Sequence, residues 1–150
     1  MGIVLVAIDA VDKNVMDWLK NDLNKAFNKQ VFVEKGMPAP VYAFNKKRNQ
    51  YLSTVILNAV MDQKEYSPYE RILGLVDHDL YVPELNFVFG EASRKAAVIS
   101  LTRLTQTFYH LTEDQNLFHQ RVLTEAVHEL GHTLWIGTLF KSSMCDVLFK

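Results

Sequence analysis

The stretch LFHQRVLTEAVHELGHTL, residues 117–134, decides how the rest of the chain packs. An apolar stripe runs through it at helical spacing, at Leu117, Val122 and Ala126. We therefore expect a helix over Leu117–Leu134 with one buried face. His128 and His132 stand at positions i and i+4, which puts both imidazoles on one helix face, one turn apart.

Upstream of this helix, strand and helix patterns alternate. Ile3–Ile8 is a continuous apolar run typical of a buried strand, and Asp12 is a suitable N-cap for a helix to about Phe27. The further expected elements are a strand at Gln30–Glu34, an extended piece at Val41–Phe44, a basic loop at Asn45–Asn49, a helix at Tyr51–Met61, a strand at Arg71–Val76, a loop at Asp77–Pro83, a short edge strand at Asn86–Gly90 and a strand at Ala96–Leu101. This order predicts a single α/β (α+β) domain over residues 1–150, with helices packed on a mixed sheet.

The composition is that of an ordinary globular domain. The 150 residues are 49% apolar and 22% charged with a net charge of −1, which argues against disorder and gives no electrostatic basis for binding nucleic acid or an anionic membrane. The single cysteine, Cys145, excludes a disulfide framework within the chain. The N-terminal MGIVLVAIDAVDK lacks a basic region and a cleavage site, and no apolar stretch reaches the roughly 18 residues of a spanning helix. We expect a cytoplasmic protein.

The sequence His128-Glu129-Leu130-Gly131-His132 carries the chemistry. Two neutral imidazoles in this arrangement can hold a zinc ion, and Glu129 can act as the general base on an attacking water. A chain of this composition contains such a pattern by chance in about 1% of cases, and the alternative is a pair of ordinary helix histidines, one buried and one exposed. The remaining histidines lack ligand spacing and are expected to be surface or structural residues: His78, His110 and His119.

Two stretches together resemble one protein family. HELGHTL and the run LGLVDHDLYVPELNFVFGEASRKAAVISLTRL (Leu73–Leu104) are closely similar to the archaemetzincins, small zinc metallopeptidases of the metzincin clan. The similarity extends from the first strand to Leu134 and includes RNQYLSTVIL before the second strand pair. The resemblance implies a mixed sheet, a C-terminal active-site helix and a peptide substrate lying along an edge strand.

Carried onto this chain, the resemblance makes His128 and His132 zinc ligands and Glu129 the catalytic base. It also implies that the substrate is a peptide or small protein that pairs with the edge strand by strand addition, through Asn86, Phe87, Val88, Phe89 and Gly90. A plain structural edge is the alternative for that segment.

The resemblance ends abruptly after Leu134. The family has a glycine three residues after the second histidine and a third histidine ligand three residues later, where this chain has Trp135 and Thr138. A threonine hydroxyl is a poor zinc ligand. The family uses several cysteines to hold a second, structural zinc. Cys145 is the only residue here that corresponds to one of them, so we do not expect that second zinc in this chain. The domain is thus expected to be incomplete at its C-terminus.

The genetic code suggests a reason for the break. Tryptophan has only the codon TGG and isoleucine codons begin with A, so Trp135–Ile136 read one base later gives GGA, glycine. Met144–Cys145 likewise gives TGT, cysteine, and Thr138–Leu139 permits histidine. One allowed reading of the tail, GLGHCSKVQCVMFSS, places the family's glycine, third histidine, two cysteines and methionine at the right spacing. We interpret Trp135–Lys150 as an out-of-frame translation; an independently evolved, degenerate tail is the alternative.

The expected function is that of a zinc-dependent metallopeptidase whose copy here is impaired, because it lacks the third histidine ligand. The site is expected to bind zinc weakly or to stay empty, and Cys145 or Asp146 are the remaining candidates for a substitute ligand. The tail after about Phe140 is expected to pack irregularly. The competing hypothesis is a non-catalytic peptide-binding module on the same scaffold, and a weaker one is a structural helper that binds a partner protein.

Overall fold

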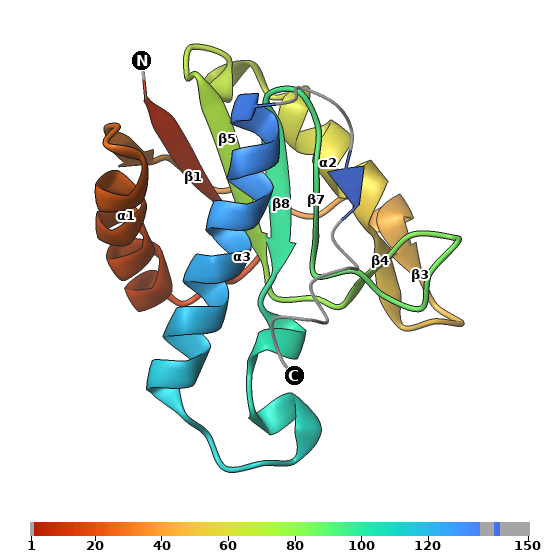
Figure 1. Cartoon of the computed structure of the whole chain (residues 1–150). Helices are drawn as coiled ribbons and strands as arrows, with labels where there is room; N and C mark the ends of the chain where they lie inside the picture. Colours follow the sequence, from red (N-terminus) through yellow and green to blue (C-terminus); the bar gives the residue numbers. More distant parts are fainter. Residues whose placement is uncertain (1, 136–139, 142–150) are drawn as a thin grey trace.

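The centre of the protein is a mixed sheet of six strands, seen in a computed structural model that describes residues 2–135 and 140–141 (Figure 1). The strands are β1 (Ile3–Ile8), β2 (Val31–Val33), β5 (Arg71–Val76), β7 (Gly90–Ala92), β8 (Ala96–Ser100) and β9 (Phe140–Lys141), in the order β2-β1-β5-β8-β7-β9. The four strands from β2 to β8 run parallel, and β7 pairs antiparallel with both β8 and β9. The predicted mixed sheet is confirmed.

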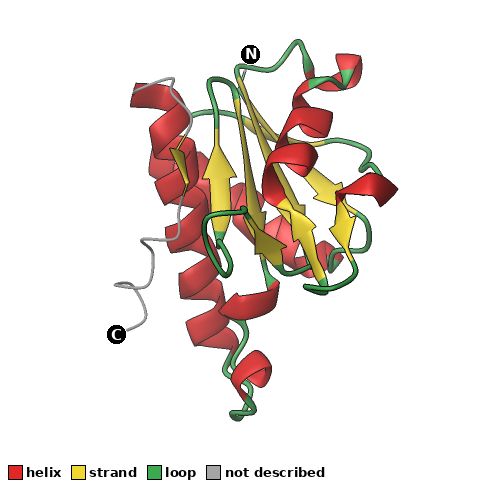
Figure 2. Ribbon diagram, turned by 90° about the vertical axis from the view of Figure 1, so that its right-hand side faces the viewer, coloured by secondary structure: helices red, strands yellow, loops and turns green. Residues whose placement is uncertain are grey.

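Helices cover both faces of this sheet (Figures 1 and 2). Helices α1 (Lys13–Phe27) and α3 (Gln115–Trp135) pack on one face and α2 (Ser53–Met61) on the other. Successive side chains of β1 point to opposite faces of the sheet. Ile3 and Leu5 belong to the core under α1 and α3, whereas Val4 and Val6 belong to the core under α2. A strand buried on both faces has no polar positions, which is why the β1 sequence is a continuous apolar run.

Local capping explains where the two long helices begin. The Asp12 side chain accepts a hydrogen bond from the Asn14 amide at 2.9 Å, which confirms the predicted N-cap of α1. Asp114 plays the same part for α3, because its side chain accepts from the Leu117 amide at 3.0 Å. The helix therefore begins at Gln115, before the predicted start at Leu117.

A second, small sheet lies beside the main one and was not predicted. It consists of β3 (Phe44–Asn45), β4 (Gln50–Leu52) and β6 (Leu80–Tyr81), in the order β3-β4-β6. Strand β4 is parallel to β6, with Tyr51 opposite Leu80, and antiparallel to β3. Four short 3-10 helices complete the described elements: η1 (Val41–Ala43), η2 (Lys64–Tyr66), η3 (Thr102–Leu104) and η4 (Thr107–Tyr109).

Four sequence-based element predictions need correction. Val41–Phe44 is mainly the 3-10 turn η1 rather than extended, because the Ala43 amide bonds back to the Pro40 carbonyl at 3.0 Å. The predicted helix Tyr51–Met61 begins with two residues of strand β4, and the predicted loop Asp77–Pro83 contains strand β6. These two strands form because they pair with each other. Asn86–Gly90 is not a strand, since the strand begins at Gly90 and continues to Ala92.

Within the described residues, no helix combines the length and the apolar composition that crossing a membrane requires. The predictions of irregular packing after Phe140, and of a substitute ligand at Cys145 or Asp146, fall on residues outside those that the structure describes, apart from the short strand β9.

Candidate metal centre

The two histidines of the HELGH sequence meet on the last third of α3. The Nε2 atoms of His128 and His132 are 3.3 Å apart, and their rings lie edge to face with centroids 4.6 Å apart. With Glu129 they form the one group of three potential metal ligands in the described part of the chain, all ligand atoms lying within 4.8 Å of one another. The predicted placement of both imidazoles on one helix face is confirmed.

The distance between the two nitrogens suits a metal ion. Two nitrogen ligands, each about 2.0–2.1 Å from one tetrahedral zinc, lie about 3.3–3.4 Å apart. Burial, and to a lesser extent the neighbouring His128, lowers the pKa of His132 below its ordinary value of 6.5. A lowered pKa keeps the imidazole of His132 neutral near pH 7, which is the form that binds a metal. The residues present therefore fit a zinc ion at two of its positions.

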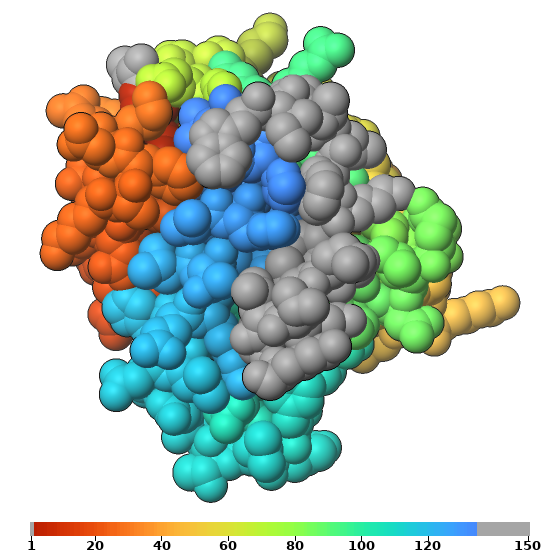
Figure 3. All heavy atoms as spheres, viewed as in Figure 1, coloured from red at the N-terminus to blue at the C-terminus, as the bar shows by residue number. Residues whose placement is uncertain are grey.

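An apolar stripe holds α3 in the orientation that presents these histidines. Val122, Ala126 and Leu130 are completely buried against the sheet, whereas His128 and His132 are half-buried. The histidines stand two positions after Ala126 and Leu130, so they lie on the side of the helix that faces away from this buried stripe. In the space-filling view α3 follows the surface of the molecule beside α1 (Figure 3).

Glu129 is completely buried and lies against strand β7. A Cβ atom added to Gly90 would lie 3.0 Å from the Oε2 atom of Glu129 and 3.1 Å from its Cγ atom. It would also lie 2.6 Å from the carbonyl oxygen of Val98 in the neighbouring strand. Only glycine therefore lets the Glu129 side chain lie this close to the sheet. Sequence reasoning missed this contact, for which an isolated glycine inside a strand pattern was the available signal.

The segment predicted to contact substrate takes an irregular path into β7. Val88 and Phe89 are buried, Phe87 is half-buried and Asn86 is exposed. The Val88 amide donates to the Leu80 carbonyl at 2.9 Å, so this part of the segment is bridged to the small sheet. Asn86–Gly90 is thus not the free edge strand that was expected.

Another strand covers the outer edge of β7. Glu91 stands opposite Lys141 and Ala92 stands opposite Phe140 in the antiparallel pair of β7 with β9. The edge of the main sheet is therefore β9 rather than β7 in the described residues. A side-chain contact also links β7 to α2. The Thr54 hydroxyl lies 2.9 and 3.1 Å from the two carboxyl oxygens of the buried Glu91.

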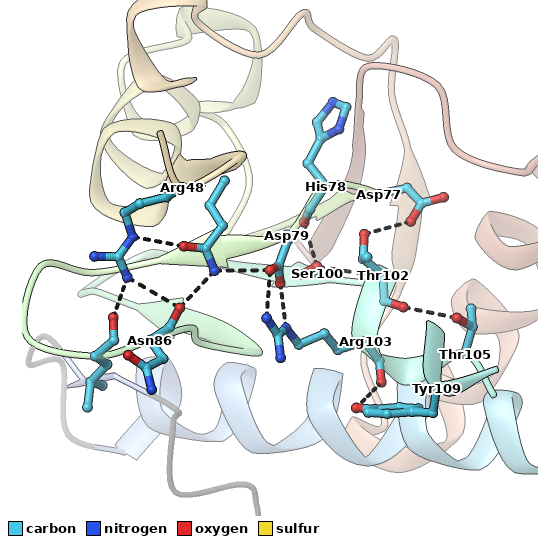
Figure 4. Close-up of polar contacts among 12 residues, drawn as sticks. Arg48, Asp77, His78, Asp79, Asn86, Ser100, Thr102, Arg103, Thr105 and Tyr109 are labelled. Atoms are coloured by element: carbon cyan, nitrogen blue, oxygen red, sulfur yellow. Dashed lines mark hydrogen bonds and ion pairs between the residues drawn. The ribbon is translucent and has the colours of Figure 1, made fainter. Parts of the chain in front are cut away.

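Side chains from the β3–β4 turn, from β4 and from η3 hold the segment before β7 (Figure 4). Arg48 and Gln50 donate to the backbone carbonyls of this segment, and Arg103 pairs with Asp79 through two hydrogen bonds of 2.7 and 2.8 Å. None of these residues was singled out from the sequence, because no spacing rule relates them. Asp79 lies in a region that was predicted to be a loop.

The remaining histidines are surface or hydrogen-bonded structural residues, as predicted. His78 pairs with Asp9 at 2.8 Å and stacks on the ring of Tyr51, with centroids 4.3 Å apart. His119 pairs with Asp22 across α3 and α1. His110 is exposed and ends η4 in a left-handed conformation.

The comparisons with known proteins all point to one family. The family model described as Peptidase family M54 matches residues 3–145. An archaemetzincin of Saccharolobus islandicus strain L.S.2.15 is 33% identical over 138 residues, covering 91% of this chain and 75% of the relative. The archaemetzincin of Methanopyrus kandleri is 35% identical over 142 residues, covering 91% and 77%.

Solved structures give the same result. The crystal structure of archaemetzincin from Archaeoglobus fulgidus complexed with malonate has a TM-score of 0.75 and 38% identity, covering 89% of this chain and 78% of that chain. A zinc-dependent peptidase from Methanocorpusculum labreanum has a TM-score of 0.77 at 26% identity, covering 90% and 82%. The fold on which the histidine pair and Glu129 lie is thus a metallopeptidase fold. The chain belongs to Peptidase family M54, together with the archaemetzincins.

Proposed function

We propose that this chain is a zinc-dependent peptidase scaffold in which His128 and His132 bind zinc, Glu129 is the general base, and hydrolysis is impaired. The observation that carries the proposal is the 3.3 Å separation of the two Nε2 atoms beside a buried glutamate. The family relationship supports zinc as the metal, because a solved relative is described as a zinc-dependent peptidase.

The chemistry divides between the metal and the protein. Zinc, when bound, polarises a carbonyl oxygen and lowers the pKa of a water molecule to about 7. His128 and His132 supply neutral nitrogen ligands. The carboxylate of Glu129 takes a proton from the attacking water and later delivers it to the nitrogen of the leaving amine. Gly90 keeps this carboxylate against β7, so its direction of approach is fixed before a peptide arrives.

The impairment follows from the ligand count. Catalytic zinc sites commonly use three protein ligands and leave one position for water or substrate. Here the third place of the family pattern holds Thr138, which lies outside the described residues. Two histidines alone hold zinc less tightly, so we expect less than one zinc per chain at ordinary metal concentrations and little hydrolysis. The second, structural zinc of the family is not expected.

Metal content is the first experiment. Protein purified without chelator or added zinc is measured by plasma mass spectrometry, with His132→Ala as the matched control. We expect less than one zinc per chain and almost none in the control. A full equivalent of zinc, together with peptide hydrolysis that Glu129→Gln abolishes, would contradict the proposed impairment.

The origin of the tail is tested at two levels. If Trp135–Lys150 is an out-of-frame translation, the coding DNA read one base later encodes the family pattern, and reading the gene decides this directly. At the protein level, replacing residues 135–149 by GLGHCSKVQCVMFSS is expected to restore zinc binding. A replaced tail that leaves zinc binding unchanged would show that the missing third ligand is not the cause of impairment.

The second candidate function is a peptide-binding module without catalysis. It is supported by the pairing of β9 with β7, because an antiparallel segment of the chain already pairs at this edge of the sheet. Binding of an unfolded polypeptide that persists in a chelator would support this alternative. For either function we propose peptides or small proteins as partners, without nucleic acid or membrane, and a cytoplasmic location.

A further inference from the structure

The segment Leu85–Phe89, called here the rim segment, is held by side chains that come from other elements. Arg48 donates through Nη2 to the carbonyl of Leu85 at 2.6 Å, and Gln50 donates through Nε2 to the carbonyl of Asn86 at 2.8 Å (Figure 4). These bonds use backbone carbonyls that a regular strand would offer to a neighbouring strand. The rim segment therefore has a fixed, irregular path that depends on its polar neighbours.

Asp79 and Arg103 form the base of this network. The Asp79 side chain is only 15% exposed and the Arg103 side chain 23%, so their two hydrogen bonds lie largely out of water. Gln50 also donates to Asp79, at 3.0 Å, which joins the ion pair to the carbonyl of Asn86. Tyr109 adds a hydrogen bond of 2.8 Å from its hydroxyl to the backbone carbonyl of Arg103.

A chain of packed rings connects Arg103 to the metal centre. The guanidinium carbon of Arg103 lies 3.9 Å from the centroid of the Phe87 ring. The Phe87 ring meets the Phe89 ring edge to face, with centroids 5.2 Å apart. The next residue is Gly90, against which Glu129 packs. Phe89 also belongs to the same buried cluster as Leu130 of α3.

We infer that Arg103 is a positioning residue for the proposed peptide site: it orders the rim segment, which leads into Gly90 beside Glu129, without touching substrate itself. Its planar guanidinium fills two roles at once, a two-point bond to a carboxylate and a flat stacking contact with a ring. Lysine keeps the charge but cannot fill both roles. This role presupposes the proposed peptide site, so the test separates the order of the rim segment from peptide binding.

The first measurement is amide hydrogen exchange in Arg103→Lys. The amides of Leu85 and Val88 donate to the carbonyls of Val82 and Leu80 at 3.0 and 2.9 Å, and they report on the order of the rim segment. We expect these two amides to exchange at least about tenfold faster than in the wild type, while amides of β1 and β5 keep their rates.

The control is Arg71→Lys. Arg71 is also half-buried and also donates to a backbone carbonyl, that of Glu70 at 2.7 Å, but it stands at the first residue of β5, whereas Asp79 follows the other end of that strand. In this control variant we expect the amides of Leu85 and Val88 to exchange at the wild-type rates. Asp79→Asn is the second test variant, should Arg103→Lys fail to fold. Wild-type exchange at Leu85 and Val88 in the variant measured would overturn the inference.

The second measurement compares metal and peptide affinity. In Arg103→Lys, cobalt(II) titrated into the protein should bind within about twofold of wild-type affinity, whereas fluorescein-labelled casein, an unfolded polypeptide, should bind at least about tenfold more weakly. Equal loss of both affinities would indicate a merely structural role and would overturn the inference. If the wild type binds no casein, the proposed function fails, and the exchange rates still decide whether Arg103 orders the rim segment.

Discussion

Replacing Gly90 by alanine tests the packing of Glu129 against β7 most directly. The new Cβ atom would lie 2.6 Å from the Val98 carbonyl oxygen, 3.0 Å from Oε2 of Glu129 and 3.1 Å from its Cγ. The first neighbour is backbone in a central strand and cannot move easily. The substitution therefore forces a shift of β7, of Glu129 or of both.

The size of the effect follows from these contacts. Adding a methyl group to a well-packed site typically costs about 1–3 kcal/mol, and the backbone contact places Gly90→Ala toward the upper part of that range. For a domain of this size, each kcal/mol lowers the melting temperature by about 2–4 °C. We expect urea unfolding in metal-free buffer to show the loss without a contribution from bound zinc.

Gly131→Ala is the matched control. A Cβ atom at Gly131 meets no described atom within 4 Å apart from its chain neighbours and the nearby backbone of its own helix, and the residue lies inside α3, next to His132. Alanine is a better helix former than glycine by about 1 kcal/mol, so this variant should be as stable as the wild type or more stable. If Gly90→Ala unfolds within about 0.5 kcal/mol of the wild type, the close packing of Glu129 is not rigid and the reasoning is wrong.

Three further substitutions test other parts of the structure. Burial raises the pKa of Asp9, but a backbone amide and His78 outweigh burial and lower this pKa below its ordinary value of 3.8. The charged Asp9 therefore stabilises the fold above pH 3.8, and this stabilisation is lost as the pH falls below that value. Asp9→Asn should flatten the fall in stability below pH 3.8 in an acid titration followed by circular dichroism; an unchanged curve would contradict this. Thr54→Val removes the hydroxyl beside buried Glu91 and should cost about 1–3 kcal/mol in urea unfolding, with Thr54→Ser close to wild type. Leu130→Ala should cost about 2–5 kcal/mol in the same assay, and a loss below 1 kcal/mol would argue against its burial between α3 and the sheet.

The sequence predicted the parts of the fold that rest on periodicity. Ile3–Ile8 has no polar position because both faces of β1 are buried, and that pattern is visible without a structure. The histidine pair was predicted for a similar reason, since a spacing of four on a helix determines which side chains share a face. Both predictions need only the geometry of one element.

The parts that were missed depend on partners distant in the sequence. Strand β6 has two residues and exists because it pairs with β4, so neither segment carries a strand pattern long enough to recognise. Gly90 was assigned to substrate contact, and its close approach to Glu129 arises only when α3 packs on β7. The Arg103–Asp79 pair is likewise a product of tertiary packing, which single-sequence patterns do not encode.

The strand β9 has a kinetic and energetic consequence for any peptide that would bind at β7. Because β9 begins at Phe140, close to the end of α3 at Trp135, it is tethered beside its partner. A short tether gives such a segment an effective local concentration on the order of millimolar. A free peptide that uses the same edge has to displace β9, so it binds β7 with a weaker apparent affinity than it would if β9 were absent. Ending the chain before Phe140 would remove this competitor and strengthen the binding of such a peptide.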